Sequence, residues 1–121
     1  MTAPPDFAIE ITSTATETLV SAVGEIDSAV SARLSDQLAA AVATGRHVVV
    51  DLSAVTFCDS SGLTALIRGH TAAEAAGTKF LVVTEQRAIT RPIALLGLAD
   101  VLRILPDLAA ARAALGPGGR A

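Results

Sequence analysis

The stretch from Arg46 to Gly77 constrains the fold more than any other part of the chain. It begins with three consecutive valines, Val48 to Val50, and such a β-branched run is typical of a strand buried on both faces of a sheet. Beyond Gly62 the apolar positions recur at helical spacing until Gly77, which can adopt the left-handed conformation that ends a helix. The stretch therefore predicts a central strand, a polar turn and a helix.

The polar turn is Asp59-Ser60-Ser61-Gly62, at the start of the predicted helix. The first backbone N–H groups of a helix have no intrahelical partner, and the helix dipole favours negative charge at this end. Asp and Ser are preferred N-cap residues. The simplest interpretation is that Asp59 or Ser60 caps the helix.

The chain has 121 residues, a length that suits one domain. Its only aromatic residues are Phe7, Phe57 and Phe80, so the core must consist of Val, Leu, Ile and Ala. Alanine-rich segments with helical spacing alternate with valine-rich segments, which predicts an α/β fold. We expect a flexible lead-in at 1–6, one domain at 7–115 and a flexible tail at 116–121.

Charge and hydropathy exclude several classes of protein. The net charge is −3, with no basic stripe and few aromatic residues for base stacking, which argues against direct nucleic-acid binding. No apolar run approaches the roughly 18 residues of a membrane span, and no signal peptide is recognisable. We therefore expect a cytoplasmic protein that does not insert into membranes. The single cysteine, Cys58, excludes an internal disulfide.

Hydrophobic periodicity predicts the other elements. The first two strands should form a hairpin, and the motif Gly24-Glu25-Ile26-Asp27 should form a turn that ends the second. Asp27 or Ser28 should then cap a helix. The predicted strands are 7–12, 18–23, 47–51, 79–84 and 101–105. One predicted helix begins at Asp27 or Ser28 and another at the Ser60 turn, and two more span 88–96 and 107–115.

Two motifs about 35 residues apart resemble those of a known family. The order of strand, Asp51-Leu52-Ser53, the apolar Phe57 and then Asp59-Ser60-Ser61-Gly62-Leu63 resembles the signature of STAS domains, in particular the bacterial anti-sigma-factor antagonists. Upstream, Gly24-Glu25-Ile26-Asp27 is similar to the second motif of that family. The resemblance covers roughly 9–115 and implies a mixed sheet of four to five strands with about four helices.

The resemblance also implies a function. In the family, the serine after the aspartate accepts a phosphate from a partner kinase, and that serine is Ser60 here. The unphosphorylated protein would bind an anti-sigma factor that is also a serine kinase, and so free the sigma factor. A phosphatase acting on phospho-Ser60 would reset the switch. ATP belongs to the kinase, so no cofactor is expected. The docking face would include Glu25, Asp27, Asp59, Ser61 and Gly62.

Two alternatives to this function remain. Glu25 and Asp27 can instead be a polar turn with a helix cap, and the domain can be a STAS scaffold subunit of a membrane lipid- or anion-transport complex. Neighbouring genes would discriminate between the two functions.

An enzyme is the rival class. A serine between a strand and a helix is similar to a nucleophile elbow, but Cys58 stands where that motif needs glycine. His47 should lie at the far end of the strand, and His70 about 15 Å along the helix from Ser60. One cysteine and two separate histidines do not form a metal site. Cys58 itself precedes a helix N-terminus, which can lower a thiol pKa, or is a small buried apolar residue.

Pro92 departs from the family pattern. It falls within a predicted helix, where proline removes one hydrogen bond and clashes with the preceding turn. Proline is tolerated in the first turn. We therefore expect the helix to begin near Thr90 or Arg91, with a longer loop before it, and this loop lies near the partner-binding face of the family.

Overall fold

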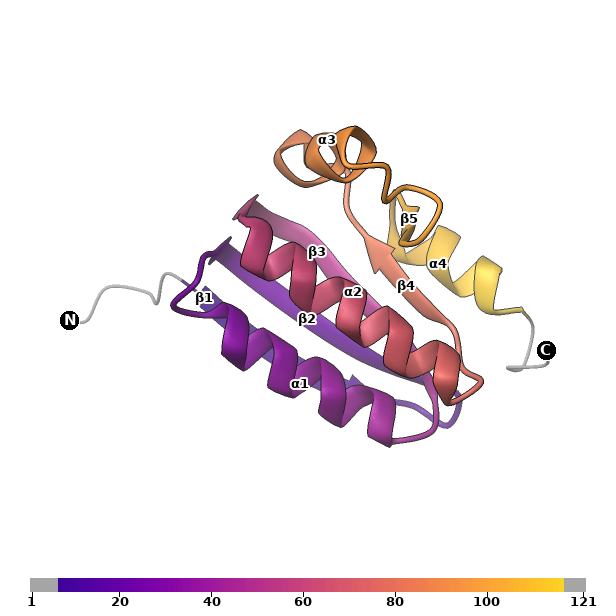
Figure 1. Cartoon of the computed structure of the whole chain (residues 1–121). Coiled ribbons are helices and arrows are strands. Elements are labelled where there is room, and N and C mark those ends of the chain that lie inside the picture. Colours follow the sequence, from indigo (N-terminus) through magenta and orange to yellow (C-terminus); the bar gives the residue numbers. More distant parts are fainter. Residues whose placement is uncertain (1–6, 117–121) are drawn as a thin grey trace.

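A computed structural model describes residues 7–116 of the chain (Figure 1). The predicted lead-in at 1–6 and the tail beyond Gly116 lie outside the described residues. One five-stranded sheet forms the centre of the fold, in the order β1-β2-β3-β4-β5. The strands are β1 (Phe7–Ser13), β2 (Glu17–Ile26), β3 (His47–Cys58), β4 (Phe80–Val83) and β5 (Arg103–Leu105). The helices are α1 (Ser31–Ala43), α2 (Ser60–Ala75), α3 (Arg87–Leu95) and α4 (Leu108–Leu115).

The sheet is mixed, as the sequence predicted. β1 and β2 form an antiparallel hairpin, whereas the β2–β3, β3–β4 and β4–β5 pairs are parallel. Parallel pairs require crossovers, which α1, α2 and α3 supply. The predicted α/β class and the alternating element order are therefore confirmed.

β3 carries the core on both faces of the sheet. Val48 and Val50 face the larger hydrophobic cluster, where α1 and α2 pack, while Val49 faces a smaller cluster that contains Ala111 and Leu115 of α4. All three valines are fully buried. In Figure 1, α1 and α2 lie together across one face of the sheet, and α4 lies on the other side. The expectation of a strand buried on both faces is confirmed.

β2 and β3 are longer than predicted. The Gly24-Glu25-Ile26 segment was expected to be a turn, but it is the last part of β2, and β3 continues beyond Asp51 to Cys58. The pairing shifts register between Ser21 and Val23 and again between Gly24 and Glu25. Gly24 has φ 111°, a conformation that glycine adopts without strain, so the strand passes through a bulge instead of ending.

The start of α1 also differs from the prediction. The residue before the helix is Val30, which supplies no side-chain cap, and neither Asp27 nor Ser28 caps α1. Asp27 stabilises the preceding turn instead: its carboxylate accepts a 3.0 Å hydrogen bond from the Ala29 amide, and its carbonyl accepts from Ser31. Asp side chains commonly bond the backbone two residues on, so the local chemistry formed a turn before the helix.

Pro92 lies inside α3, and the predicted start near Thr90 or Arg91 is wrong. The Gln86 carbonyl accepts hydrogen bonds from the amides of Ile89 and Thr90, so the helix is established before the proline. Ile89 and Ile93 are fully buried on either side of Pro92. Burial of these two side chains offsets the one hydrogen bond that proline removes.

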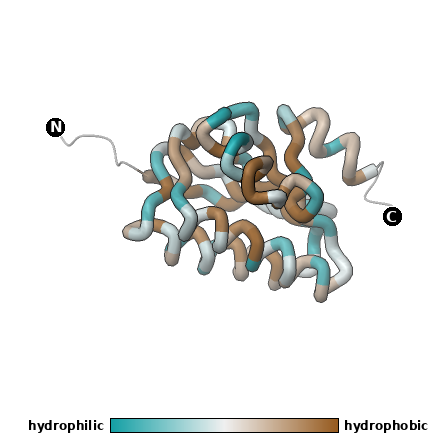
Figure 2. The backbone as a smooth tube through the Cα atoms, turned by 45° about the horizontal axis from the view of Figure 1, so that its top comes forward, coloured by the Kyte–Doolittle hydropathy of each residue, from teal (hydrophilic) through white to brown (hydrophobic). Residues whose placement is uncertain are grey.

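Two strongly exposed hydrophobic residues lie at the end of α3. Leu95 and Leu96 are 75% and 64% exposed, respectively. In Figure 2, where α3 comes forward, its turns carry both hydrophobic and hydrophilic colouring. α3 therefore covers the core with Ile89 and Ile93, and its exposed side carries Arg87 and Arg91 as well as Leu95.

Candidate functional site

The two sequence motifs meet where β2 and β3 end. Glu25 pairs with Phe57, and Ile26 pairs with Cys58, in parallel register. The Asp59 amide then donates a 3.0 Å hydrogen bond to the Ile26 carbonyl. Because the carboxyl ends of parallel strands lie at one edge of a sheet, the segments that follow them are brought side by side. The two motifs therefore lie side by side in the structure.

Asp59 is the N-cap of α2, as one of the two sequence alternatives predicted. Its Oδ1 accepts hydrogen bonds from the Ser61 amide at 2.9 Å, the Gly62 amide at 3.1 Å and the Ser61 hydroxyl at 2.6 Å. The hydrogen bond from the Ser61 hydroxyl is the largest cause that holds the pKa of Asp59 below its ordinary value. Partial burial acts in the opposite direction, and the backbone N–H groups of Gly62, Ser61 and Ser28 lower the pKa further. Asp59 is therefore ionised at neutral pH.

Ser60 and Ser61 have different environments although they are adjacent. The Ser61 hydroxyl is half-buried and donates to Asp59. Ser60 is exposed at the first position of α2, and among residues 7–116 its hydroxyl has no hydrogen-bond partner; its carbonyl accepts from the Thr64 hydroxyl. Only Ser60 thus presents a free hydroxyl to solvent at this turn.

Gly62 is buried where α2 contacts the ends of β2 and β3. A Cβ atom at this position would lie 2.5 Å from the Cys58 sulfur and 2.7 Å from Ile26 Cγ2. Glycine is therefore required at this position for close packing. Burial, with a smaller contribution from the Asp59 charge, raises the pKa of the Cys58 thiol to about 11. Cys58 is therefore a buried apolar residue, and the alternative of an activated thiol is wrong.

Glu25 and Asp27 are exposed beside this turn. Glu25 lies across from Phe57, which is itself 45% exposed. Asp27 follows Ile26, whose carbonyl is bonded to the Asp59 amide. The residues of the predicted docking face, apart from buried Gly62, are thus at least partly accessible at one edge of the sheet.

A groove beside the turn was not predicted. It has a volume of about 350 Å³ and lies between α1 and α2. The sequence does place hydroxyl residues three or four positions apart on both predicted helices. This spacing does not show which faces of the two helices pack together, so it does not predict a groove. Its lining residues are Ser31, Ala32, Ser35, Ser61, Thr64, Ala65 and Arg68.

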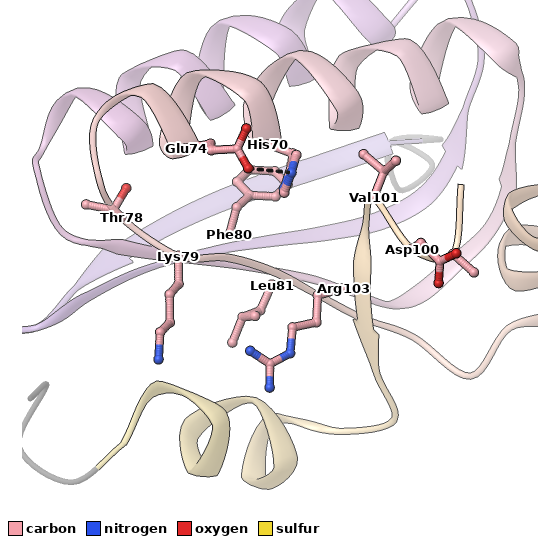
Figure 3. Close-up of a pocket in the computed structure, with 10 residues that line it drawn as sticks. His70, Glu74, Thr78, Lys79, Phe80, Leu81, Asp100, Val101 and Arg103 are labelled. Carbon is pink, nitrogen blue, oxygen red and sulfur yellow. Dashed lines mark ion pairs between the residues drawn. The ribbon is translucent and has the colours of Figure 1, made fainter. Parts of the chain in front are cut away.

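A larger cavity of about 460 Å³ lies away from the turn. Figure 3 shows His70 and Glu74 on α2 above β4, and Arg103 on β5 beside it. His70 Nε2 lies 3.9 Å from a Glu74 carboxylate oxygen, and the His70 ring meets Phe80 edge-on. His70 is ten residues beyond Ser60, or roughly 15 Å along the helix, so this cavity and the Ser60 turn are separate.

The positions of the two histidines bear on catalysis. His47 begins β3, at the opposite end from Ser60, and its Nδ1 accepts a hydrogen bond from the Lys79 amide. With His70 also distant, no histidine stands where it could take a proton from Ser60. Within residues 7–116, no three His, Cys, Asp or Glu side chains come together as metal ligands. None of the helices in the same range has the length and apolar character to cross a bilayer.

The fold and the two converging motifs define a known class. A family model described as "Mlab, STAS domain" matches residues 9–106, and the chain belongs to the STAS domain family. An anti-sigma factor antagonist from Mycobacterium paratuberculosis, known from a crystal structure, has 33% sequence identity to this chain. The alignment covers 94% of this chain and 97% of that one, with a TM-score of 0.84. No curated protein matches the chain.

More distant structures share the fold. SpoIIAA, an anti-sigma factor antagonist solved in its unphosphorylated form, is 16% identical over 90% of this chain and 97% of that one, with a TM-score of 0.75. The murine anion transporter Slc26a9 is 20% identical over 84% of this chain but only 18% of the transporter, with a TM-score of 0.69. At these identities the likeness extends to the fold alone.

Proposed function

We propose that the chain is an anti-sigma-factor antagonist controlled by phosphorylation of Ser60. The unphosphorylated form binds an anti-sigma factor that is also a serine kinase, and so frees the sigma factor. Phosphorylation of Ser60 breaks the complex, and a serine phosphatase restores it. The match to an antagonist at 33% identity over nearly the whole chain supports the general role.

The observation that carries the assignment of Ser60 as the phosphorylated residue is its free, exposed hydroxyl. The neighbouring Ser61 hydroxyl is hydrogen-bonded to Asp59. A kinase must reach its acceptor oxygen from solvent. Phosphorylation of Ser61 would first require loss of its 2.6 Å bond to Asp59. Ser60 needs no such rearrangement.

The electrostatics of the turn favour a switch that leaves the fold intact. A phosphate adds about −1.5 to −2 charges at pH 7. At a helix N-terminus each negative charge is worth roughly 0.3–1 kcal/mol in favour of the folded state, and repulsion from ionised Asp59 opposes part of that. At an interface, an unpaired buried charge can cost about 2–5 kcal/mol. Phosphorylation therefore acts mainly on the complex.

The proposed activity needs no catalysis by this chain. Ser60 lacks a neighbouring histidine base, and the phosphoryl group comes from the ATP of the kinase. The chain is then a substrate and a binding partner. We place it in the cytoplasm, where sigma factors and their antagonists act.

The test uses the purified chain and each anti-sigma factor with a kinase domain from the same organism. Binding is measured by titration calorimetry, and phosphopeptides are mapped after incubation with ATP. The proposal predicts one binding partner and one phosphate, on Ser60. A chain that binds none of these factors, or that receives phosphate only on Ser61 or elsewhere, would contradict it.

The alternative is a constitutive STAS scaffold in a lipid- or anion-transport complex, since the anion transporter Slc26a9 contains a domain of the same fold. In that case the chain co-purifies with a permease and an ATPase, and Ser60→Asp leaves the complex intact. Binding to an anti-sigma factor that is lost in Ser60→Asp excludes this alternative.

A further inference from the structure

We infer that the docking surface extends from the Ser60 turn onto the uncovered face of the sheet, where Phe57 and Val23 contact a basic surface of the anti-sigma factor. The inference rests on the proposed function and adds both the location of the contact and the chemistry of the partner. It is carried by the exposure of two apolar strand residues and by the charges around them.

The uncovered face lies opposite α1 and α2. α4 covers the part of this side formed by Val49, Leu81 and Val83, with Leu19 and Leu105 packed at its margin. Side chains alternate between the two faces along a strand, so strand register identifies the residues that share the uncovered part. We call this part the open face; it consists of Ala8, Glu10, Ser21, Val23, Glu25, Asp51, Ala54 and Phe57.

Register brings the apolar residues of the open face together. Val23 of β2 pairs with Ala8 of β1 on one side and with Ala54 of β3 on the other. Glu25 is two residues beyond Val23 on β2, and its partner on β3 is Phe57. Val23 is 53% exposed and Phe57 is 45% exposed. Phe57 is three residues before Ser60, so the apolar strip is continuous with the proposed phosphorylation turn. Large aromatic side chains near the centre of an interface commonly dominate its affinity.

The charges of the open face specify the partner. Glu10, Glu25 and Asp51 carry carboxylates, and none of the open-face residues is Lys or Arg. Of the three, Asp51 bonds locally to the Ser53 amide and hydroxyl. A partner with Lys or Arg side chains around an apolar centre complements this arrangement. A second copy does not, because a two-fold contact through the same face would bring like charges together.

The first experiment measures affinity for the anti-sigma factor that binds the parent chain. Phe57→Ala removes the aromatic anchor, and Val23→Lys introduces a charge that repels a basic partner. We expect each variant to bind at least about tenfold more weakly, with melting temperatures that show both are folded. If Phe57→Ala fails to fold, Val23→Lys still tests the inference because Val23 is the more exposed of the two.

Ile11→Lys is the matched control. Ile11 is also an apolar strand residue, 38% exposed, but it pairs with Val20 and faces the α1 side of the sheet. The substitution adds the same charge on the opposite face, so we expect affinity within about twofold of the parent. Equal weakening by Ile11→Lys and Val23→Lys would overturn the inference, because the effect would then be one of net charge.

The second experiment tests electrostatics. Glu10→Gln and Glu25→Gln together should slow association and reduce its dependence on salt. An unchanged salt dependence overturns the basic-partner assignment.

Parent-like affinity of Phe57→Ala and Val23→Lys overturns the open-face contact alone, whereas absence of any anti-sigma factor binding overturns the proposed function itself. A parent dimer in sedimentation that Val23→Lys dissociates would assign the open face to a second copy instead.

Discussion

The amide nitrogen of Asp59 lies 3.0 Å from the carbonyl oxygen of Ile26 and donates a hydrogen bond to it. This bond joins the last residue of β2 to the residue that caps α2. The Gly24-Glu25-Ile26-Asp27 motif and the Asp59-Ser60-Ser61-Gly62 turn thus share one backbone frame. A change that displaces either segment will displace the other.

Gly62→Ala should destabilise the fold. Its Cβ would come within 2.7 Å of both the Cys58 sulfur and Ile26 Cγ2, closer than van der Waals contact permits. Overpacking of this kind costs roughly 1–3 kcal/mol in the free energy of unfolding. Urea denaturation measures the loss. Adding Cys58→Ala should recover part of it, because the nearest clash is removed; strictly additive losses would contradict this packing account.

Cys58 should be unreactive in the native protein at pH 8. Burial raises the pKa of its thiol to about 11, so only about one molecule in a thousand carries the reactive thiolate. Labelling with a chromogenic disulfide reagent should be slow in buffer and complete in denaturant, at one thiol per chain. Rapid labelling of the folded protein would show that the site is open.

Ser61→Ala should shift acid unfolding to higher pH. The Ser61 hydroxyl is the main cause that lowers the pKa of Asp59. A group with a lowered folded-state pKa stabilises the fold above its unfolded pKa, and this contribution is lost as pH falls through the folded value. Without the hydroxyl, the folded-state pKa of Asp59 lies closer to its unfolded value, so this contribution is smaller and the less stable fold is lost at a higher pH.

Carboxyl NMR titration measures the pKa of Asp59 in Ser61→Ala, and an acid-unfolding curve measures the pH at which this variant unfolds. Thr64→Ala is the matched control, because it also removes a helix hydroxyl but one that bonds the Ser60 carbonyl and no carboxylate. Equal acid-unfolding midpoints for the two variants would argue against the role of Ser61.

Substitutions of Ser60 should separate binding from folding. Ser60→Ala should keep affinity for the anti-sigma factor and resist phosphorylation, because the Asp59 cap does not use its hydroxyl. Ser60→Asp should bind roughly 30-fold more weakly or worse, the lower bound of a buried unpaired charge. Melting temperatures of both variants should stay close to that of the parent. Ser60→Asp with parent affinity would remove the basis for the switch.

Much of the site could be predicted from the sequence because the relevant chemistry is local. An Asp before two serines and a glycine, ahead of an apolar helical period, predicted the N-terminus of α2, and Asp59 is its cap. The three valines of β3 predicted burial on both faces. In both cases the residues that carry the signal are neighbours along the chain, so pattern and structure depend on the same contacts.

Other features depended on tertiary pairing and were missed. Asp51 and Ser53 are turn-forming residues, yet β3 continues because its second half pairs with β2. Gly24 and Asp27 suggested a turn and a cap, but the register shift keeps Gly24 in the strand and leaves Asp27 to bond the Ala29 amide. Local propensities were overridden by hydrogen bonds to a strand more than 25 residues away in the chain.

The sequence by itself determined the α/β class, the central strand, the start of α2 at the polar turn and the two motifs. Only the tertiary structure decided that Ser60 has a free hydroxyl while Ser61 is bonded, that Gly62 faces Cys58 and Ile26, and that Val23 and Phe57 share an open face. The physical reason is the range of the interactions involved. Capping and periodicity act within about one helical turn, whereas exposure depends on which distant segments cover each side chain.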